Sequence, residues 1–211
     1  MLTIGWFSRF SASSFMNAVP CLIGTGLLMA TSLQAATLTV TTLEDLEQND
    51  GLCSLSEAII SASSNINRFG DCGNAGEPDP ATDIITFDDS LWTSGNTALI
   101  TLNPFIGRLP DLVGNVEIRP RSVIQQRRVR VVGNGNARIL RILRPADDRQ
   151  TTTLIDRMEF QNGYVLDGVG GGLRIEAGLQ VTLRNCRFFD HTAVGNGAAV
   201  GVFEELDEPN A

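Results

Sequence analysis

Residues 53–59 read Cys-Ser-Leu-Ser-Glu-Ala-Ile, and this stretch decides how the rest of the chain is interpreted. Ser54 is a favoured N-cap residue, and Glu57 follows three positions later, which is the spacing of a capping box. Apolar residues then recur at helical spacing, so the sequence predicts one short amphipathic helix that ends near Asn65. The capping and buried residues of this predicted cap helix are Ser54, Leu55, Glu57, Ala58, Ile59 and Ala62.

Short runs of strand-forming residues follow the helix between Ile84 and Phe203, and most are bounded by Gly, Asn, Asp or Pro. No segment between them is long and periodic enough to be the crossover helix of a βαβ unit. Parallel strands would therefore be joined by turns, as in a solenoid, and the single helix would cover one exposed end of that solenoid. A β-sandwich is the alternative that these runs leave open.

A weak internal repeat favours the solenoid. Residues 153–160 align with residues 182–189 at an offset of 29, which matches Leu154 with Leu183 and Phe160 with Phe189. Farther along, the glycine run 170–172 approximately matches residues 197–199. Because equivalent residues of successive coils lie above one another in a solenoid, we expect Phe160 to stack near Phe189.

Three stretches, TLTVTT (37–42), CSLSEAI (53–59) and DIITFDDSL (83–91), resemble in their order the N-terminal region of the CSLREA-domain proteins. Ser56 departs from the family motif, which has arginine there. The resemblance implies an all-β fold, namely a right-handed single-stranded parallel β-helix with a short N-terminal α-helical cap. We expect a cap region at residues 36–82, a β-helix of about five coils of ~25 residues at 83–203, and an acidic tail at 204–211.

The first 35 residues have the pattern of an export signal. Arg9 is the only charge before Glu44, an apolar run extends from Val19 to Met29, and small residues suit cleavage after Ala35. The run is shorter than a membrane span, which needs ~20 apolar residues. We therefore expect a signal peptide at residues 1–35 and a secreted or cell-surface mature chain without a transmembrane segment. An uncleaved membrane anchor is the alternative.

Three cysteines remain after such cleavage, and export would expose them to oxidising conditions. Cys53 opens the predicted helix and Cys72 lies in the turn-rich loop beyond it, so we predict a Cys53–Cys72 disulfide that stabilises the fold by about 3 kcal/mol. Cys186 lies in a strand-like run, where a free cysteine behaves as a small hydrophobe. Two free thiols are the alternative to the disulfide, and the cysteine spacing does not match a zinc site.

The charge of the chain is acidic overall but unevenly distributed. Removal of residues 1–35 takes away one arginine and no acid, so the net charge changes from −8 to −9, which argues against nucleic-acid binding. Eight arginines and no acid lie between Glu117 and Asp147. Four of them, Arg119, Arg121, Arg128 and Arg130, are predicted to form an outward-facing strip that binds an acidic polysaccharide or cell-surface glycan. A solvated face that complements the acidic cap region is the alternative.

The sequence contains no recognisable catalytic pattern, and we predict no cofactor or metal. Asp88 and Asp89 fall where the first strand is expected to end, which favours a role in a turn. His191, the only histidine, aligns with Asn162 in the repeat, which also indicates a turn. The favoured hypothesis is an exported, adhesin-like binding or scaffold protein. The alternatives are a polysaccharide lyase or hydrolase, of the kind found on pectin lyase-like β-helices, and a truncated remnant of a longer surface protein.

Overall fold

The computed structural model describes residues 35–73, 81–121, 124, 126–166, 168–195 and 197–203. The predicted acidic tail and all but the last residue of the predicted signal peptide lie outside these ranges. Within them the chain is all-β apart from one α-helix and one short 3-10 helix, and its parallel strands stack as a solenoid, which confirms the predicted β-helix. No helix in the same ranges is long and apolar enough to cross a bilayer.

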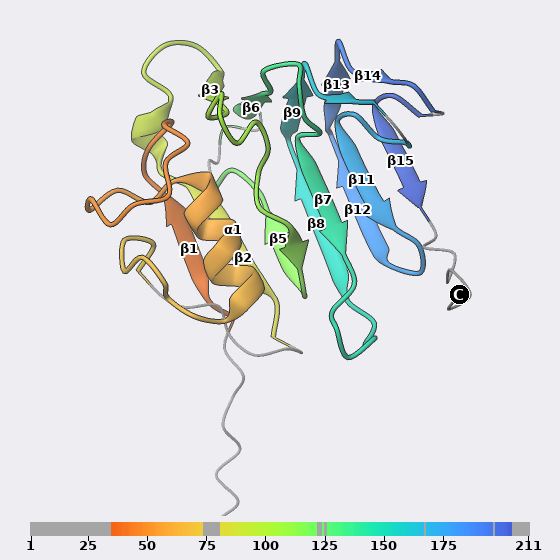
Figure 1. Cartoon of the computed structure of the whole chain (residues 1–211). Helices are drawn as coiled ribbons and strands as arrows, with labels where there is room; N and C mark the ends of the chain where they lie inside the picture. The colour runs from red at the N-terminus through yellow and green to blue at the C-terminus, as the bar shows by residue number, and fades with distance from the viewer. Residues whose placement is uncertain are drawn as a thin grey trace, which may run out of the picture. The chain divides into compact units, whose positions relative to one another are not determined.

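The strands form three long sheets and one short sheet, and each strand pairing among the described residues is parallel (Figure 1). Sheet A contains β1 (Thr37–Val40), β2 (Asp83–Phe87), β5 (Val116–Ile118), β8 (Thr152–Asp156) and β12 (Gln180–Arg184). Sheet B contains β3 (Thr97–Thr101), β6 (Arg128–Val132), β9 (Met158–Gln161) and β13 (Arg187–Phe189). Sheet C contains β4 (Leu112–Val113), β7 (Leu140–Leu143), β11 (Leu173–Glu176) and β15 (Val200–Phe203), and sheet D pairs β10 (Tyr164–Val165) with β14 (Thr192–Ala193).

Within the described residues the chain passes through sheets A, B and C in that order in each coil, and it completes four such coils after β1. The prediction of five coils of ~25 residues is therefore wrong. Along sheet A, 33 residues separate Asp83 from its partner Val116, and 37 separate Val116 from Thr153. Extra residues lie, for example, in the loop 144–151, which lengthens its coil without adding a strand.

On sheets A and B the last two coils are offset by 28 residues, one less than predicted. On sheet C, Leu173 pairs with Val200, an offset of 27, which confirms the predicted match of residues 170–172 with residues 197–199. Leu183 pairs with Ile155 instead of Leu154, and Phe188 instead of Phe189 lies on Phe160. The Phe160 and Phe188 rings stack with their centroids 5.3 Å apart. A slip of one residue matters because side chains alternate between the two faces of a strand, so an offset of 29 would place Leu183 over an outward-facing residue.

Alternation also separates the core from the outer walls of the solenoid. On β6, Val129 and Val131 are fully buried, whereas Arg128 and Arg130 point outward. The buried cluster continues from β1 through β9 to Leu173 and Ile175 of β11. In the last coil the apolar side chains are only partly buried, because among the described residues no later strand covers them.

The predicted cap helix is α1 (Leu55–Ser64), which lies at the β1 end of the solenoid (Figure 1). Its capping box is confirmed: the Ser54 hydroxyl accepts from the Glu57 amide, and Glu57 Oε2 accepts from the Ser54 amide at 2.9 Å. Asn65 ends the helix in a left-handed conformation, with φ of 54°. The apolar face formed by Leu55, Ala58, Ile59 and Ala62 is buried.

The predicted Cys53–Cys72 disulfide is present, and the two Cα atoms are 4.8 Å apart. It joins the residue just before the N-cap of α1 to the loop that follows the helix, and both cysteines are buried. Cys186 is free and half-buried, and its thiol lies 3.3 Å from the carbonyl oxygen of Ile155. The covalent link therefore lies in the cap region, as predicted.

The cap region covers the first strand of each long sheet. Strand β1 pairs with β2 of sheet A, and Glu44 forms a parallel bridge with Thr101 of β3 in sheet B. At sheet C, the Ser63 hydroxyl of α1 accepts from the amide of Val113 on β4 at 3.1 Å. These contacts occupy backbone groups that would otherwise be open to pairing at this end of the solenoid.

Ser56 of α1 donates to the carboxylate of Asp45 at 2.5 Å. The other oxygen of that carboxylate accepts from the backbone amide of Asn103, 3.1 Å away in the loop after β3. Asp45 is buried, so these two bonds compensate its removal from water. Ser56 therefore links α1 to the first coil through Asp45.

Candidate functional site: the outer faces of the solenoid

Glu159 is a buried carboxylate surrounded by arginines on the outer face of sheet B. It points outward from β9, yet only 1% of its side chain is exposed. Arg130 on β6 binds its Oε2 atom at 2.7 Å, and Arg187 on β13 binds Oε1 at 3.2 Å. Arg128 lies farther away, with 3.7 Å between its Nε and Oε1. Three coils thus converge on one carboxylate.

The strip of four arginines predicted from the sequence does not form as one unit. Arg128 and Arg130 do face outward, as predicted, but both neutralise Glu159. Arg119 and Arg121 follow β5 on sheet A, whereas Arg128 and Arg130 lie on β6 of sheet B. The two arginine pairs therefore lie on different sheets of the solenoid.

Arg119 and Arg121 instead line a hollow of about 430 Å³, together with Thr37, Ile84 and Thr86. We call the hollow that these five residues line the sheet A hollow. Arg119 forms an ion pair with Glu117 at 3.1 Å and remains 43% exposed. The guanidinium of Arg121 has no ion-pair partner among the described residues, although its charge helps to lower the pKa of Asp88, which is lowered mainly by hydrogen bonds from Ser90.

Thr86 is the most informative residue of the sheet A hollow. Its side chain points outward from β2, between the inward-facing Ile85 and Phe87, and is nevertheless 3% exposed. Within the described part of the chain its hydroxyl has no hydrogen-bond partner. A buried hydroxyl without a partner costs free energy, about 1–3 kcal/mol, so its position beside two arginines indicates a place where a polar ligand would satisfy it.

A second hollow of about 250 Å³ lies farther along the same sheet. Its polar walls come from β5, β8 and β12 and include Glu117, Thr152, Gln180 and Thr182. Hydroxyl and amide groups of this kind exchange hydrogen bonds with sugar hydroxyls. The outer face of sheet A therefore carries an arginine-lined hollow on its first strands and a polar hollow on its later strands.

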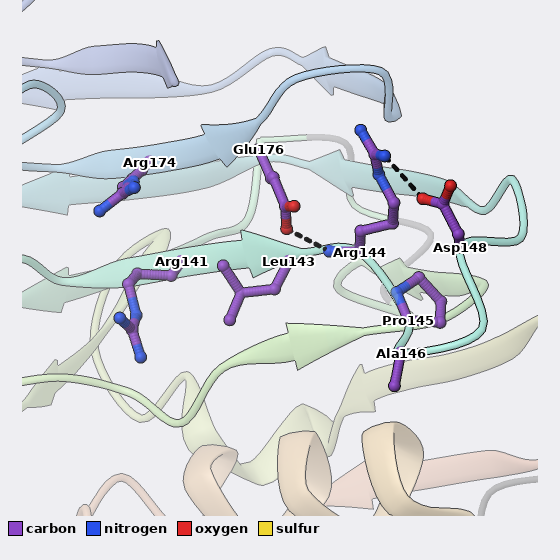
Figure 2. Close-up of a pocket in the computed structure, with 8 residues that line it drawn as sticks. All are labelled: Arg141, Leu143, Arg144, Pro145, Ala146, Asp148, Arg174 and Glu176. Carbon is purple, nitrogen blue, oxygen red and sulfur yellow. Dashed lines mark hydrogen bonds and ion pairs between the residues drawn. The ribbon is translucent and has the colours of Figure 1, made fainter. Parts of the chain in front are cut away.

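The largest of these hollows, about 560 Å³, lies on the outer face of sheet C (Figure 2). We name it the sheet C hollow; its walls are Arg141, Leu143, Arg144, Pro145, Ala146, Asp148, Arg174 and Glu176. In the sequence Arg141 and Arg144 belong to the arginine-rich stretch between Glu117 and Asp147, and no local pattern connects them with Arg174 and Glu176. The grouping becomes visible only when β7 and β11 are placed side by side.

The residues considered for catalysis have structural roles. Asp88 accepts from the Ser90 amide at 2.9 Å and caps the 3-10 helix η1 (Asp89–Leu91), as expected for a turn residue. His191 Nδ1 accepts from the Gly163 amide and Nε2 donates to the Phe160 carbonyl, both at 3.0 Å. Burial lowers the pKa of this imidazole. The predicted equivalence of His191 with Asn162 is wrong by one residue. Strand β14 pairs with β10 at an offset of 28, so His191 is equivalent to Gly163.

In the described ranges, no group of three or more His, Cys, Asp or Glu residues could hold a metal ion. Comparison with known proteins returns no family model, no curated protein and no solved structure that matches the chain.

Proposed function

We propose that the chain is an exported, surface or extracellular β-helix protein of the CSLREA type that acts by binding, and that its ligand is an acidic polysaccharide lying along the outer face of sheet A. The observation that carries this proposal is the sheet A hollow, in which the buried, unpartnered hydroxyl of Thr86 lies in the same wall as Arg119 and Arg121.

The chemistry of the hollow fits a uronate unit. Guanidinium groups bind carboxylates through two parallel hydrogen bonds, and Arg121 is available for this among the described residues. A sugar hydroxyl next to the carboxylate would supply the partner that Thr86 lacks. The polar hollow farther along sheet A would accommodate the next sugar units, so a chain of several residues is favoured over a monosaccharide.

Arg128 and Arg130 are not part of the proposed site, because both form ion pairs with the buried carboxylate of Glu159. The proposed site therefore keeps half of the arginine set that the sequence suggested and adds Thr37, Ile84 and Thr86. Export is a separate element of the proposal. Mass spectrometry of the extracellular or periplasmic fraction should find an N-terminus at Ala36 or Thr37, and an intact N-terminus at Met1 on the bulk of that protein would contradict it.

Binding is tested by calorimetric titration with oligogalacturonate at low salt. Wild type should bind, and the double variant Arg119→Gln, Arg121→Gln should bind at least tenfold more weakly, because each charge-assisted hydrogen bond contributes roughly 1.5–3 kcal/mol. The affinity should also fall as salt shortens the Debye length from ~10 Å at 0.1 M to ~3 Å at 1 M.

The matched control is Arg68→Gln, Arg108→Gln, which removes the same charge from residues that do not line the hollow. It should bind as wild type does. An equal loss of affinity in both double variants would mean that net charge, and not the sheet A hollow, governs binding. Absence of binding by wild type at low salt would refute the proposal outright.

A further inference from the structure

We infer that the sheet C hollow is a second binding site, which takes a compact polar ligand carrying one phosphate or sulfate group. This inference does not depend on the proposed function, because it concerns a different sheet and a different set of arginines. It starts from two register neighbours on the outer wall, Arg141 of β7 and Arg174 of β11.

These two guanidinium groups differ in how their charge is compensated. Arg141 binds both oxygens of Asp111, through its Nε at 2.7 Å and through its Nη2, and the same carboxylate also pairs with Arg108. Arg174, in contrast, has no carboxylate partner among the described residues. Neighbouring strands lie ~4.8 Å apart, so Arg174 projects next to another cation without an anion of its own. An anion in the hollow would supply the partner that Arg174 lacks.

The guanidinium of Arg174 is also held in place. Its Cζ atom lies 3.8 Å from the centre of the Phe203 ring on β15. A cation–π contact of this kind covers one face of the planar group and leaves the N–H groups along its edge available to acceptors. Because the group is already ordered, less conformational entropy is lost when an anion binds.

The opposite end of the hollow has the reverse charge, and this restricts the ligand. Figure 2 shows Arg141 and Arg174 at one end and Glu176 and Asp148 toward the other. Glu176 accepts from the backbone amide of Arg144 at 2.7 Å, and Asp148, which is 74% exposed, binds the Arg144 guanidinium at 2.6 Å. These two carboxylates would repel a second anionic group but would accept hydrogen bonds from hydroxyls.

The shape of the hollow supports the same ligand class. Its volume of about 560 Å³ lies within the range of ligand pockets, roughly 300–1,000 Å³, and its remaining walls are Leu143, Pro145 and Ala146. The N–H edge of the Arg174 guanidinium can donate two parallel hydrogen bonds to a tetrahedral oxyanion. A sugar monophosphate or monosulfate therefore fits the hollow, whereas a polyanion does not.

The test is calorimetric titration of the full chain with glucose 6-phosphate, glucose 6-sulfate and glucose at low salt. Wild type should bind at least one of the two esters, and the arms of the titration show whether phosphate or sulfate is preferred. The Arg174→Gln variant should bind at least tenfold more weakly. Arg68→Gln is the matched control, because Arg68 also stacks on a phenylalanine, Phe69, but lies outside the hollow.

Three results would overturn the inference. Wild type could bind glucose and its esters equally well, it could bind neither ester, or Arg68→Gln could lose as much affinity for the ester as Arg174→Gln does. The variant Arg119→Gln, Arg121→Gln should bind the esters as wild type does, so the two proposed sites can fail separately. If Arg174→Gln does not fold, arginine labelling of wild type with phenylglyoxal replaces it. The bound ester should then protect Arg174, and unchanged labelling of Arg174 would contradict the inference.

Discussion

Substitution of Glu159 tests whether the arginines of sheet B serve the fold or an external ligand. The change Glu159→Gln keeps the size of the side chain and one acceptor oxygen, but it removes the negative charge. The three arginines around it, Arg128, Arg130 and Arg187, then face one another without a carboxylate between them.

The size of the effect follows from the burial of each partner. Loss of one partner from a fully buried ion pair costs about 3–5 kcal/mol. Here Glu159 is 1% exposed, but the side chains of Arg130 and Arg187 are 33% and 56% exposed, so water compensates part of the loss. We therefore expect a decrease of about 2–3 kcal/mol in the free energy of unfolding. In a domain of this size this corresponds to a decrease of roughly 5–10 °C in Tm.

The assay is urea-induced unfolding followed by circular dichroism, with thermal melts as a second measurement. Glu117→Gln is the control, because its carboxylate is 19% exposed and pairs with an arginine that is 43% exposed. That pair should contribute less than about 1 kcal/mol. If Glu159→Gln destabilises no more than Glu117→Gln does, the convergence of three arginines on Glu159 does not stabilise the fold, and Arg128 and Arg130 return as candidates for ligand binding.

Two further predictions concern the ends of the solenoid. Ile59→Asp places an unpaired charge on the buried face of α1 and should lower the free energy of unfolding in urea by several kcal/mol. The control Ile66→Asp, at a position that is 62% exposed, should change it by less than ~0.5 kcal/mol. Similar urea midpoints for the two variants would mean that α1 does not cover the core. Burial lowers the pKa of His191 in the folded state, so the neutral ring contributes stability that is present above its ordinary pKa of 6.5 and is lost as the pH falls through the lower folded value. Wild type should therefore lose more stability between pH 7.5 and pH 5 than His191→Gln, and equal losses would contradict this role.

Local chemistry made the cap region predictable from the sequence. The capping box needs only Ser54 and Glu57 at a spacing of three residues, and the stop at Asn65 follows from its tolerance of positive φ. The disulfide could be predicted because Cys53 and Cys72 flank the same short helix. Each of these features depends on residues that are close in sequence.

Features that depend on the stacking of coils could not be read in the same way. The alignment of residues 153–160 with residues 182–189 suggested an offset of 29 between the coils. The offset of 28 is seen only in the pairing of the strands, for example of Glu159 with Arg187. The arginines around Glu159 lie on β6 and β13, so their convergence follows from the register of three coils. The sheet C hollow likewise depends on the pairing of β7 with β11, which no local sequence pattern predicts.

The most direct measurement of the proposed function is a crystal structure of the chain in complex with trigalacturonate. The proposal predicts a ligand carboxylate within hydrogen-bond distance of the Arg121 guanidinium, a sugar hydroxyl at the Thr86 hydroxyl, and the remaining units over the polar hollow of sheet A. A ligand seated at Arg128 and Arg130, or on another sheet, with the sheet A hollow empty, would contradict it.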